Sequence, residues 1–366
     1  PFLFGEWDAD GPGEAAVLYT SDPSTNVWLA ILEPSGDDWR VTQTVEGLSG
    51  EVETVTYAHL RDADSLQLLV GYTSAQGDRY LVVYLYSDET LQTILNQQYT
   101  EMILADVTGS AETQDLVLAI PTDTENGGVT LNLLTNTDQG FQSLQTLNIG
   151  EGDYSGCAAL HAGTDAAGRP WLVMDGWASA ARNSLASSII TYDSETGFLG
   201  TYYPEGISPS TMRRQTLRYD PALLSTDIDG NGTIDIPQEL TDGGILNEPL
   251  DSRLKFLLWQ DYGDESGGNF CFGIYDSEYR FFLPLPESMH GNVLVRPNGP
   301  GTGWLLCNAA GTMAYCELRI VDPAEAGGEN YVRIATIGSQ QLQFREINNY
   351  YGLTASDLQK GVVLFE

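Results

Sequence analysis

Positive charge is scarce in this sequence. Sixteen Lys and Arg residues stand against 51 Asp and Glu residues, which gives a formal net charge of -35 at pH 7. Binding to nucleic acid depends on clustered cationic side chains, and the only such cluster here is the pair Arg213 and Arg214, so nucleic acid is excluded as an expected partner. The acidity indicates a well-solvated surface that resists aggregation, although cations and basic surfaces are also suitable partners.

Cysteine is also rare, with 4 copies in 366 residues. This number excludes a small scaffold held together by many disulfides. In "LLCNAAGTMAYC", a hairpin that turns at Gly311 and Thr312 would place Cys307 and Cys316 directly opposite each other, within disulfide reach. The alternative is a pair of free, buried thiols.

Long apolar runs are absent as well. No stretch approaches the length of about 20 residues that a membrane-spanning helix needs, and no positively charged leader precedes an apolar segment. We therefore expect no transmembrane segment in this chain, and we expect a monomer. Because the chain begins at Pro1 rather than at Met, we also expect a signal or a lipid anchor upstream.

Helical periodicity is nearly missing. The best candidate helix is "TASDLQKGVV" near the end of the chain, where Thr354 or Ser356 is a suitable N-cap. Short apolar runs of four to eight residues, bounded by Gly, Asp, Asn or Ser, recur instead, for example "RYLVVYLY" and "DLVLAI". Hydrophobic residues make up 42% of the chain, which is enough for a core. The sequence therefore predicts a folded, mainly β protein.

An Asp-containing loop recurs between apolar strands. Its anchors are spaced by 54, 44, 59 and 62 residues, and they are Asp8, Asp62, Asp106, Asp165 and Asp227. Units of roughly 40 to 60 residues with four strands each are typical of β-propeller blades, because one four-stranded sheet must stack on its neighbours to bury both faces. A pair of β-sandwiches would contain similar strands but gives no reason for an Asp loop at the same point of every unit.

The acidic loop followed by a strand such as "DLVLA" resembles the FG-GAP and VCBS repeats of integrin-type propellers and of many bacterial surface proteins and lipoproteins. The resemblance covers Phe2 to Tyr275 and is strongest in the last loop. It implies calcium binding between the first two strands of a blade, and an extracellular or cell-surface location. We expect a β-propeller of about five four-stranded blades over residues 1–275. A small α+β domain would follow over residues 276–366, unless those strands supply additional blades.

The last loop, "TDIDGNGTIDIP", has the spacing of a calcium-binding loop. Oxygen donors occupy its first, third, fifth, seventh and ninth positions, which are Asp227, Asp229, Asn231, Thr233 (through its carbonyl) and Asp235. Gly232 stands at the sixth position, where such a loop turns sharply. We expect a structural Ca²⁺ ion here; the alternative is an Asp/Gly turn without metal. The loop from Asp8 to Glu14 is a weaker candidate, because Pro12 and a shorter spacing leave fewer ligands.

No catalytic constellation emerges from the sequence. "GDESGG" at Gly263 to Gly268 and "TYAH" at Thr56 to His59 follow the chain order of a chymotrypsin-like protease, but Glu265 interrupts the turn that would carry the nucleophile. His161 and His290 lack partners at metal-binding spacing.

We therefore expect a non-enzymatic binding or scaffold protein with a protein or glycan ligand. The alternatives are a propeller-type glycan hydrolase, which needs clustered carboxylates and aromatic side chains at the channel mouth, and a purely structural envelope component.

Overall fold

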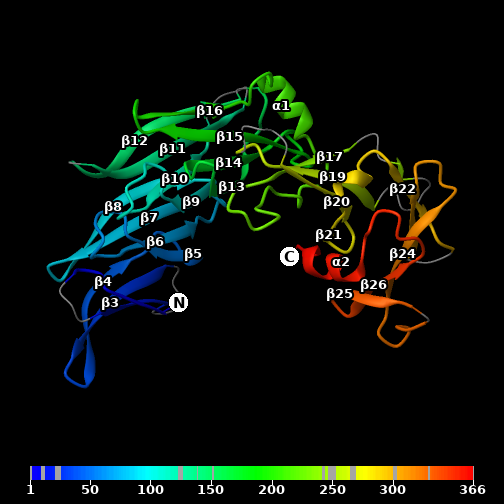
Figure 1. Ribbon diagram of the computed structural model, residues 1–366. Coiled ribbons are helices and arrows are strands. Elements are labelled where there is room, and N and C mark those ends of the chain that lie inside the picture. The colour runs from blue at the N-terminus through cyan, green and yellow to red at the C-terminus, as the bar shows by residue number, and fades with distance from the viewer. Residues whose placement is uncertain are drawn as a thin grey trace. The chain divides into compact units, whose positions relative to one another are not determined.

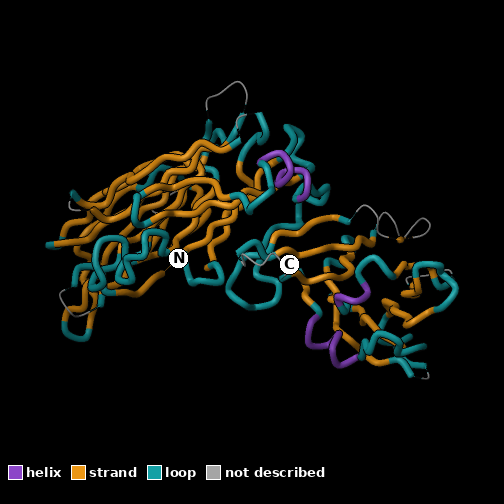
Figure 2. Tube along the Cα trace, turned by 45° about the horizontal axis from the view of Figure 1, so that its top comes forward, coloured by secondary structure: helices purple, strands orange, loops and turns teal. Residues whose placement is uncertain are grey.

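The computed structural model describes residues 2–9, 13–20, 26–122, 127–137, 139–150, 152–240, 244–245, 253–263, 269–299, 303–328 and 330–365 (Figure 1). Strands make up 55% of the described residues, and Figure 2 shows how strongly they dominate. The expectation of a mainly β protein is thereby confirmed. Among the described residues, none of the helices has both the length and the apolar character required to cross a membrane.

The chain forms two compact units. The first comprises Pro1–Thr164, Gly168–Arg182 and Ser188–Tyr202, and the second comprises Asp165–Ala167, Asn183–Ser187 and Tyr203–Glu366. The boundary that we expected after residue 275 lies inside strand β20 (Phe270–Asp276), which pairs with neighbours on both sides. The main segment of the second unit therefore begins at Tyr203, about 70 residues before the expected boundary.

The first unit contains four sheets, each of four antiparallel strands in chain order, which run from blue to green in Figure 1. The first two sheets are β1 (Phe2–Gly5), β2 (Glu14–Thr20), β3 (Val27–Ser35) and β4 (Asp38–Glu46), then β5 (Glu51–Ala58), β6 (Gln67–Thr73), β7 (Arg79–Ser87) and β8 (Thr90–Tyr99). The other two are β9 (Glu101–Ala105), β10 (Asp115–Ile120), β11 (Val129–Thr137) and β12 (Gly140–Ile149), then β13 (Cys157–Thr164), β14 (Pro170–Trp177), β15 (Leu185–Asp193) and β16 (Phe198–Tyr202).

The first three sheets of the first unit pack face to face in chain order. In β6, Leu68 and Val70 belong to the core shared with the first sheet, whereas Leu69 belongs to the core shared with the third. Successive side chains of a strand point to opposite faces, so both faces of this strand are buried. That arrangement explains why "LLVGY" is a continuous apolar run rather than an alternating one.

The second unit contains two sheets and both α-helices. One sheet has the order β17 (Ile236–Glu239), β19 (Leu254–Gln260), β20, β21 (Phe281–Pro284) and β27 (Val363–Leu364). The other has the order β18 (Gly244–Ile245), β22 (Val293–Pro297), β23 (Trp304–Asn308), β24 (Ala314–Val321), β26 (Gln340–Glu346) and β25 (Val332–Ile337). A 3₁₀ helix (Glu287–Met289) precedes β22.

The helices begin where capping side chains stand. Ser208 caps α1 (Pro209–Gln215), and Thr354 caps α2 (Ala355–Gly361) in a reciprocal box with Asp357. Of the two N-caps considered for the last helix, Thr354 is the one used. The apolar core of this unit includes Phe256 and Phe272 on the first sheet and Trp304 on the second.

The predicted pairing of Cys307 with Cys316 is wrong in register. A bulge in the hairpin of β23 and β24 places Cys307 opposite Ala314 and Cys316 opposite Leu306. One extra residue on a strand shifts every partner beyond it, which spacing around a turn does not reveal. All four cysteines are free thiols, and three of them are buried.

Candidate functional site

The loop from Asp227 to Asp235 is closed by an isolated antiparallel bridge between Thr226 and Asp235, with N–O distances of 3.1 and 2.9 Å. Inside the loop, the Asp227 carboxylate accepts hydrogen bonds from the backbone amides of Gly230, Asn231 and Gly232 at 2.7, 3.0 and 2.8 Å. Gly230 and Gly232 both have positive φ angles, of 79° and 91°, so the tight turn depends on them. The local sequence thus folds around its first carboxylate.

Three carboxylates converge in this loop. Asp227, Asp229 and Asp235 each contribute an oxygen, and these oxygens lie within 4.8 Å of one another. Asp235 is 2% exposed, and its Oδ2 accepts a hydrogen bond from the Ile228 amide at 3.0 Å. Burial raises the pKa of Asp235 to about 7, although the hydrogen bond from Ile228 acts to lower it. The negative charges of Asp229, Asp261 and Asp227 add to the rise. The arrangement is suited to a hard cation with oxygen ligands.

The other two predicted ligands have different surroundings. The Asn231 side-chain oxygen accepts a hydrogen bond from the Thr233 amide at 2.7 Å, and its Nδ2 donates to Asp229 at 3.3 Å. Thr233 is buried at 4% exposure. The geometry therefore brings together the three acidic members of the predicted set, while the Asn231 oxygen is already engaged within the turn.

Asp261 is a fourth carboxylate that sequence reasoning missed. It follows β19, is 3% exposed, and accepts hydrogen bonds from the Gly263 amide at 2.7 Å and from Asn269 Nδ2 at 3.1 Å. Its charge contributes to the raised pKa of Asp235. No signal in the loop itself could have identified Asp261, because strand pairing brings it there from 26 residues downstream.

Four of the five Asp loops share a structural element that their anchors did not reveal. A buried acid or amide at the start of the following strand accepts a backbone hydrogen bond from the loop. Its members are Glu14 (from Trp7, 2.7 Å), Gln67 (from Leu60, 2.7 Å), Asp115 (from Val107, 2.8 Å) and Asp235 (from Ile228, 3.0 Å). This residue holds each loop against its strand, so the repeat has a structural role in all four places.

A second acidic group lies in the first unit. Oxygens of Glu6, Asp8 and Glu14 lie within 4.8 Å of one another, and Glu14 is 1% exposed. The predicted loop from Asp8 to Glu14 is described only in part, because Asp10, Gly11 and Pro12 lie outside the described residues.

The residues set aside as catalytic candidates have ordinary partners where they are described. His161 Nε2 lies 3.1 Å from Asp175 Oδ2, His59 Nδ1 lies 2.9 Å from the Ser65 carbonyl, and the His290 ring lies 5.1 Å from that of Phe272. Ser266 and the rest of "GDESGG" after Gly263 lie outside the described residues.

A cavity of about 470 Å³ in the first unit combines charged and aromatic side chains. Its wall includes Glu101, Arg79 and Trp177. Burial raises the pKa of Glu101 despite the opposing charge of Arg79. Arg79 forms ion pairs with both Glu53 and Glu101, at N–O distances of 2.5 Å and 3.0 Å, respectively. Both carboxylates are therefore held by the same guanidinium.

Comparison with known proteins gives no family. No protein-family model matches the sequence, and no curated protein matches it. Similar solved structures include the rhamnogalacturonan lyase YesW, with 13% identity over 66% of this chain and 58% of that chain and a TM-score of 0.27. A rhamnogalacturonan lyase from Bacillus licheniformis has 12% identity over 66% and 58% of the two chains and a TM-score of 0.27. A putative 6-phosphogluconolactonase from Bacteroides fragilis has 10% identity over 74% and 79% and a TM-score of 0.30. The chain thus spans 58% of the length of the first of these lyases.

Proposed function

We propose that this protein is a non-enzymatic binding protein of the extracellular space or cell surface, with a structural Ca²⁺ ion in the Asp227–Asp235 loop. The observation that carries the proposal is the convergence of Asp227, Asp229 and the almost fully buried Asp235. Like charges at this separation repel, and a bound cation would turn that repulsion into attraction. The ion would then tie the loop to the strand that starts at Ile236.

Calcium suits this loop better than magnesium. Calcium accepts six to eight oxygen ligands in a flexible geometry, whereas magnesium requires a strict octahedron and gives up its water reluctantly. Asp227, Asp229 and Asp235 would supply the charge, and the Asn231 amide and the Thr233 carbonyl would complete the set after a small rearrangement of the turn. The role is stabilising, because the ion would cross-link the carboxylates of the loop to the start of the strand that follows it.

The propeller is part of the proposal. Support comes from the order of the sheets in the first unit, where four antiparallel meanders follow one another, the first and second sheets share a core, and the second and third sheets share another. Propellers display loops on a rigid scaffold, which suits recognition of a protein or glycan by a monomeric, surface-tethered or secreted chain.

A glycan hydrolase is the second candidate function, and the cavity at Glu101 is the observation in its favour. A carboxyl group whose pKa is raised by burial, close to Trp177, has the features of a general acid beside a sugar-binding surface. The shared contact of Glu101 and Glu53 with Arg79 favours the binding role instead, because a carboxylate held by a guanidinium is a poor proton donor. Release of reducing sugar from plant or bacterial polysaccharides, abolished in Glu101→Gln, would favour the hydrolase.

The test of the calcium proposal is thermal unfolding in chelator, in calcium and in magnesium. A ligand that binds only the folded state stabilises it by about 2.7 kcal/mol at a hundred times its dissociation constant. We expect the melting temperature to rise by several degrees in millimolar calcium and by less in magnesium. Identical melting temperatures in all three buffers would rule out a stabilising ion.

A further inference from the structure

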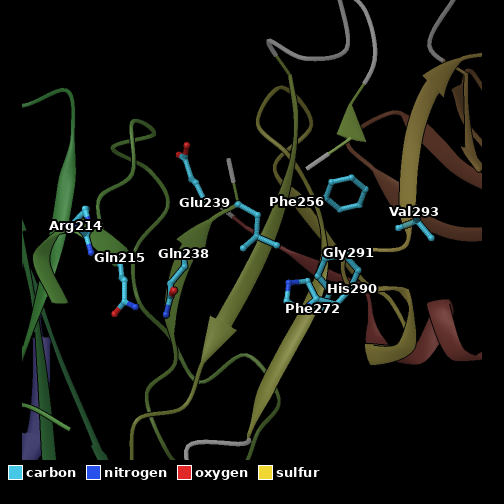
Figure 3. Close-up of a pocket in the computed structure, with 10 residues that line it drawn as sticks. Arg214, Gln215, Gln238, Glu239, Phe256, Phe272, His290, Gly291 and Val293 are labelled. Carbon is cyan, nitrogen blue, oxygen red and sulfur yellow. The ribbon is translucent and has the colours of Figure 1, made fainter. Parts of the chain in front are cut away.

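The second unit contains a cavity of about 540 Å³ that the calcium loop does not use (Figure 3). Arg214 at the end of α1, Gln238 and Glu239 on β17, Phe256 on β19, Phe272 on β20 and His290 after the 3₁₀ helix all contribute to its wall. Ligand pockets in proteins typically have volumes of about 300 to 1,000 Å³, so this cavity is large enough for a small molecule. In Figure 3, Arg214 lies at one end, the aromatic side chains lie at the other, and Gln238 lies between them.

One end of the cavity offers an uncommitted positive charge. Within the described part of the chain, the Arg214 guanidinium forms no ion pair and no hydrogen bond, and the residue is exposed. The carboxylate of Glu239 is already neutralised, because Lys255 Nζ lies 2.6 Å from its Oε1, which also accepts a hydrogen bond from the Tyr219 amide at 3.1 Å. In a chain of net charge -35, this end is therefore a local exception that attracts an anion.

The other end is apolar and rigid. The rings of Phe256 and Phe272 stack with centroids 5.5 Å apart and an interplanar angle of 15°, and each residue is 3% exposed. The exposed ring of His290 lies 5.1 Å from that of Phe272 and 5.9 Å from that of Phe270. A ring or alkyl group that enters this end would exchange water for aromatic carbon.

We propose that this cavity binds a small organic carboxylate with an apolar body, with the carboxylate on Arg214 and the apolar part against His290 and the edge of Phe272. A guanidinium matches a carboxylate through two parallel hydrogen bonds. Gln238 is fixed between the two ends by the hydrogen bond that its Nε2 donates to Tyr262 at 2.7 Å. The inference goes beyond the proposed recognition of a protein or glycan by adding a small-molecule site, and it does not depend on the proposed calcium ion.

The experiment is calorimetric titration of the full chain, saturated with calcium, with 3-phenylpropanoate. We expect saturable binding that weakens about tenfold in Arg214→Ala and several-fold in His290→Ala. Both residues are exposed, so the variants should melt with the wild-type protein. The matched control is Arg296→Ala, which removes the same charge from an exposed position of the same unit outside the cavity wall and should bind normally.

Two further ligands separate the halves of the proposal. The neutral alcohol 3-phenylpropanol and the acidic sugar D-glucuronate should each bind at least tenfold more weakly than 3-phenylpropanoate. Equal binding of the alcohol would refute the role of Arg214, and equal binding of glucuronate would refute the apolar end. Absence of saturable 3-phenylpropanoate binding overturns the inference, whereas the calcium proposal is judged separately, by the melting temperature.

Discussion

Asp227 and Asp235 stand at the two ends of one loop, and each uses its carboxylate to bind the backbone of that loop. Asp227 accepts hydrogen bonds from three amides inside the turn, and Asp235 accepts one from Ile228, next to Asp227. This reciprocal arrangement holds oxygens of the two carboxylates within 4.8 Å. Their repulsion opposes the turn that their hydrogen bonds favour, and a cation between them would remove the conflict.

Asp229 is the exposed carboxylate of the loop, so replacing it should affect the proposed metal site with little effect on the fold. Its carboxylate accepts hydrogen bonds from the backbone amide and the side-chain amide of Asn231 within the same turn. We expect Asp229→Ala to lose most of the calcium-dependent rise in melting temperature and to melt near the wild-type value in chelator. Differential scanning calorimetry in both buffers measures this difference.

The control for Asp229→Ala is Asp64→Ala, in the loop anchored at Asp62, which resembles the calcium-binding pattern less closely than the last loop does. Asp64 is exposed, and its backbone amide rather than its carboxylate binds Asp62, at 3.2 Å. This variant should keep the full response to calcium. If Asp64→Ala loses the response as completely as Asp229→Ala, the Asp227 loop is not the site of the ion.

Stability in chelator should depend on pH through Asp235. Burial, then the neighbouring carboxylates, raise its pKa from 3.8 to about 7 in the folded protein. The folded state therefore holds this proton more tightly than the unfolded state does, and stability present below about pH 4 is lost as the pH rises toward 7. Asp235→Asn cannot ionise, so its melting temperature in chelator should fall less than that of the wild type between pH 4.5 and pH 7.

Calcium should reverse that trend. Because the ion and the proton compete for Asp235, the rise in melting temperature on adding calcium should grow between pH 5 and pH 7. A calcium response that is the same at both pH values would argue against Asp235 as a ligand.

Arg253 and Asp276 form a buried ion pair in the second unit. Arg253 Nε lies 3.0 Å from Asp276 Oδ2, and their side chains are 12% and 0% exposed. Burial raises the pKa of Asp276, and Arg253 opposes that rise. Arg253→Met leaves a buried carboxylate without its cation, so we expect a loss of about 3 kcal/mol in the free energy of unfolding, measured with urea.

Neutralising the remaining partner should recover part of that loss. Asp276 also accepts hydrogen bonds from the amides of Glu278 and Tyr279 at 3.1 Å each, and asparagine keeps an acceptor for them. The double variant Arg253→Met with Asp276→Asn should therefore be more stable than Arg253→Met alone. The opposite order would mean that lost packing of Arg253, rather than the uncompensated charge, is responsible.

All four cysteines should react as thiols once the chain is unfolded, and mass spectrometry after alkylation should count four adducts. In the folded protein, burial and then the charges of Asp235 and Asp229 raise the pKa of the half-buried Cys271 to about 11. Little thiolate is then present at pH 8, so iodoacetamide should modify Cys271 slowly. A linked Cys307–Cys316 peptide in a digest without reductant would contradict the free-thiol structure.

Features that depend on neighbouring residues could be predicted from the sequence. Alternating and continuous apolar runs identified the strands, and Thr354 was one of two N-caps expected for the last helix. The alternation of oxygen donors from Asp227 to Asp235 singled out three carboxylates that the structure places within 4.8 Å of one another. Each of these features follows from spacing along the chain, where backbone geometry fixes which side chains meet.

Features that depend on strand pairing were decided only by the tertiary structure. The bulge between Leu306 and Cys307 separated two cysteines that the spacing had placed opposite each other, and β20 crossed the boundary expected at residue 275. Asp261 reached the Asp227–Asp235 loop, and His290 reached Phe272, from other segments of the chain. Because pairing register and the packing of distant strands arise from the whole core, no local pattern records them.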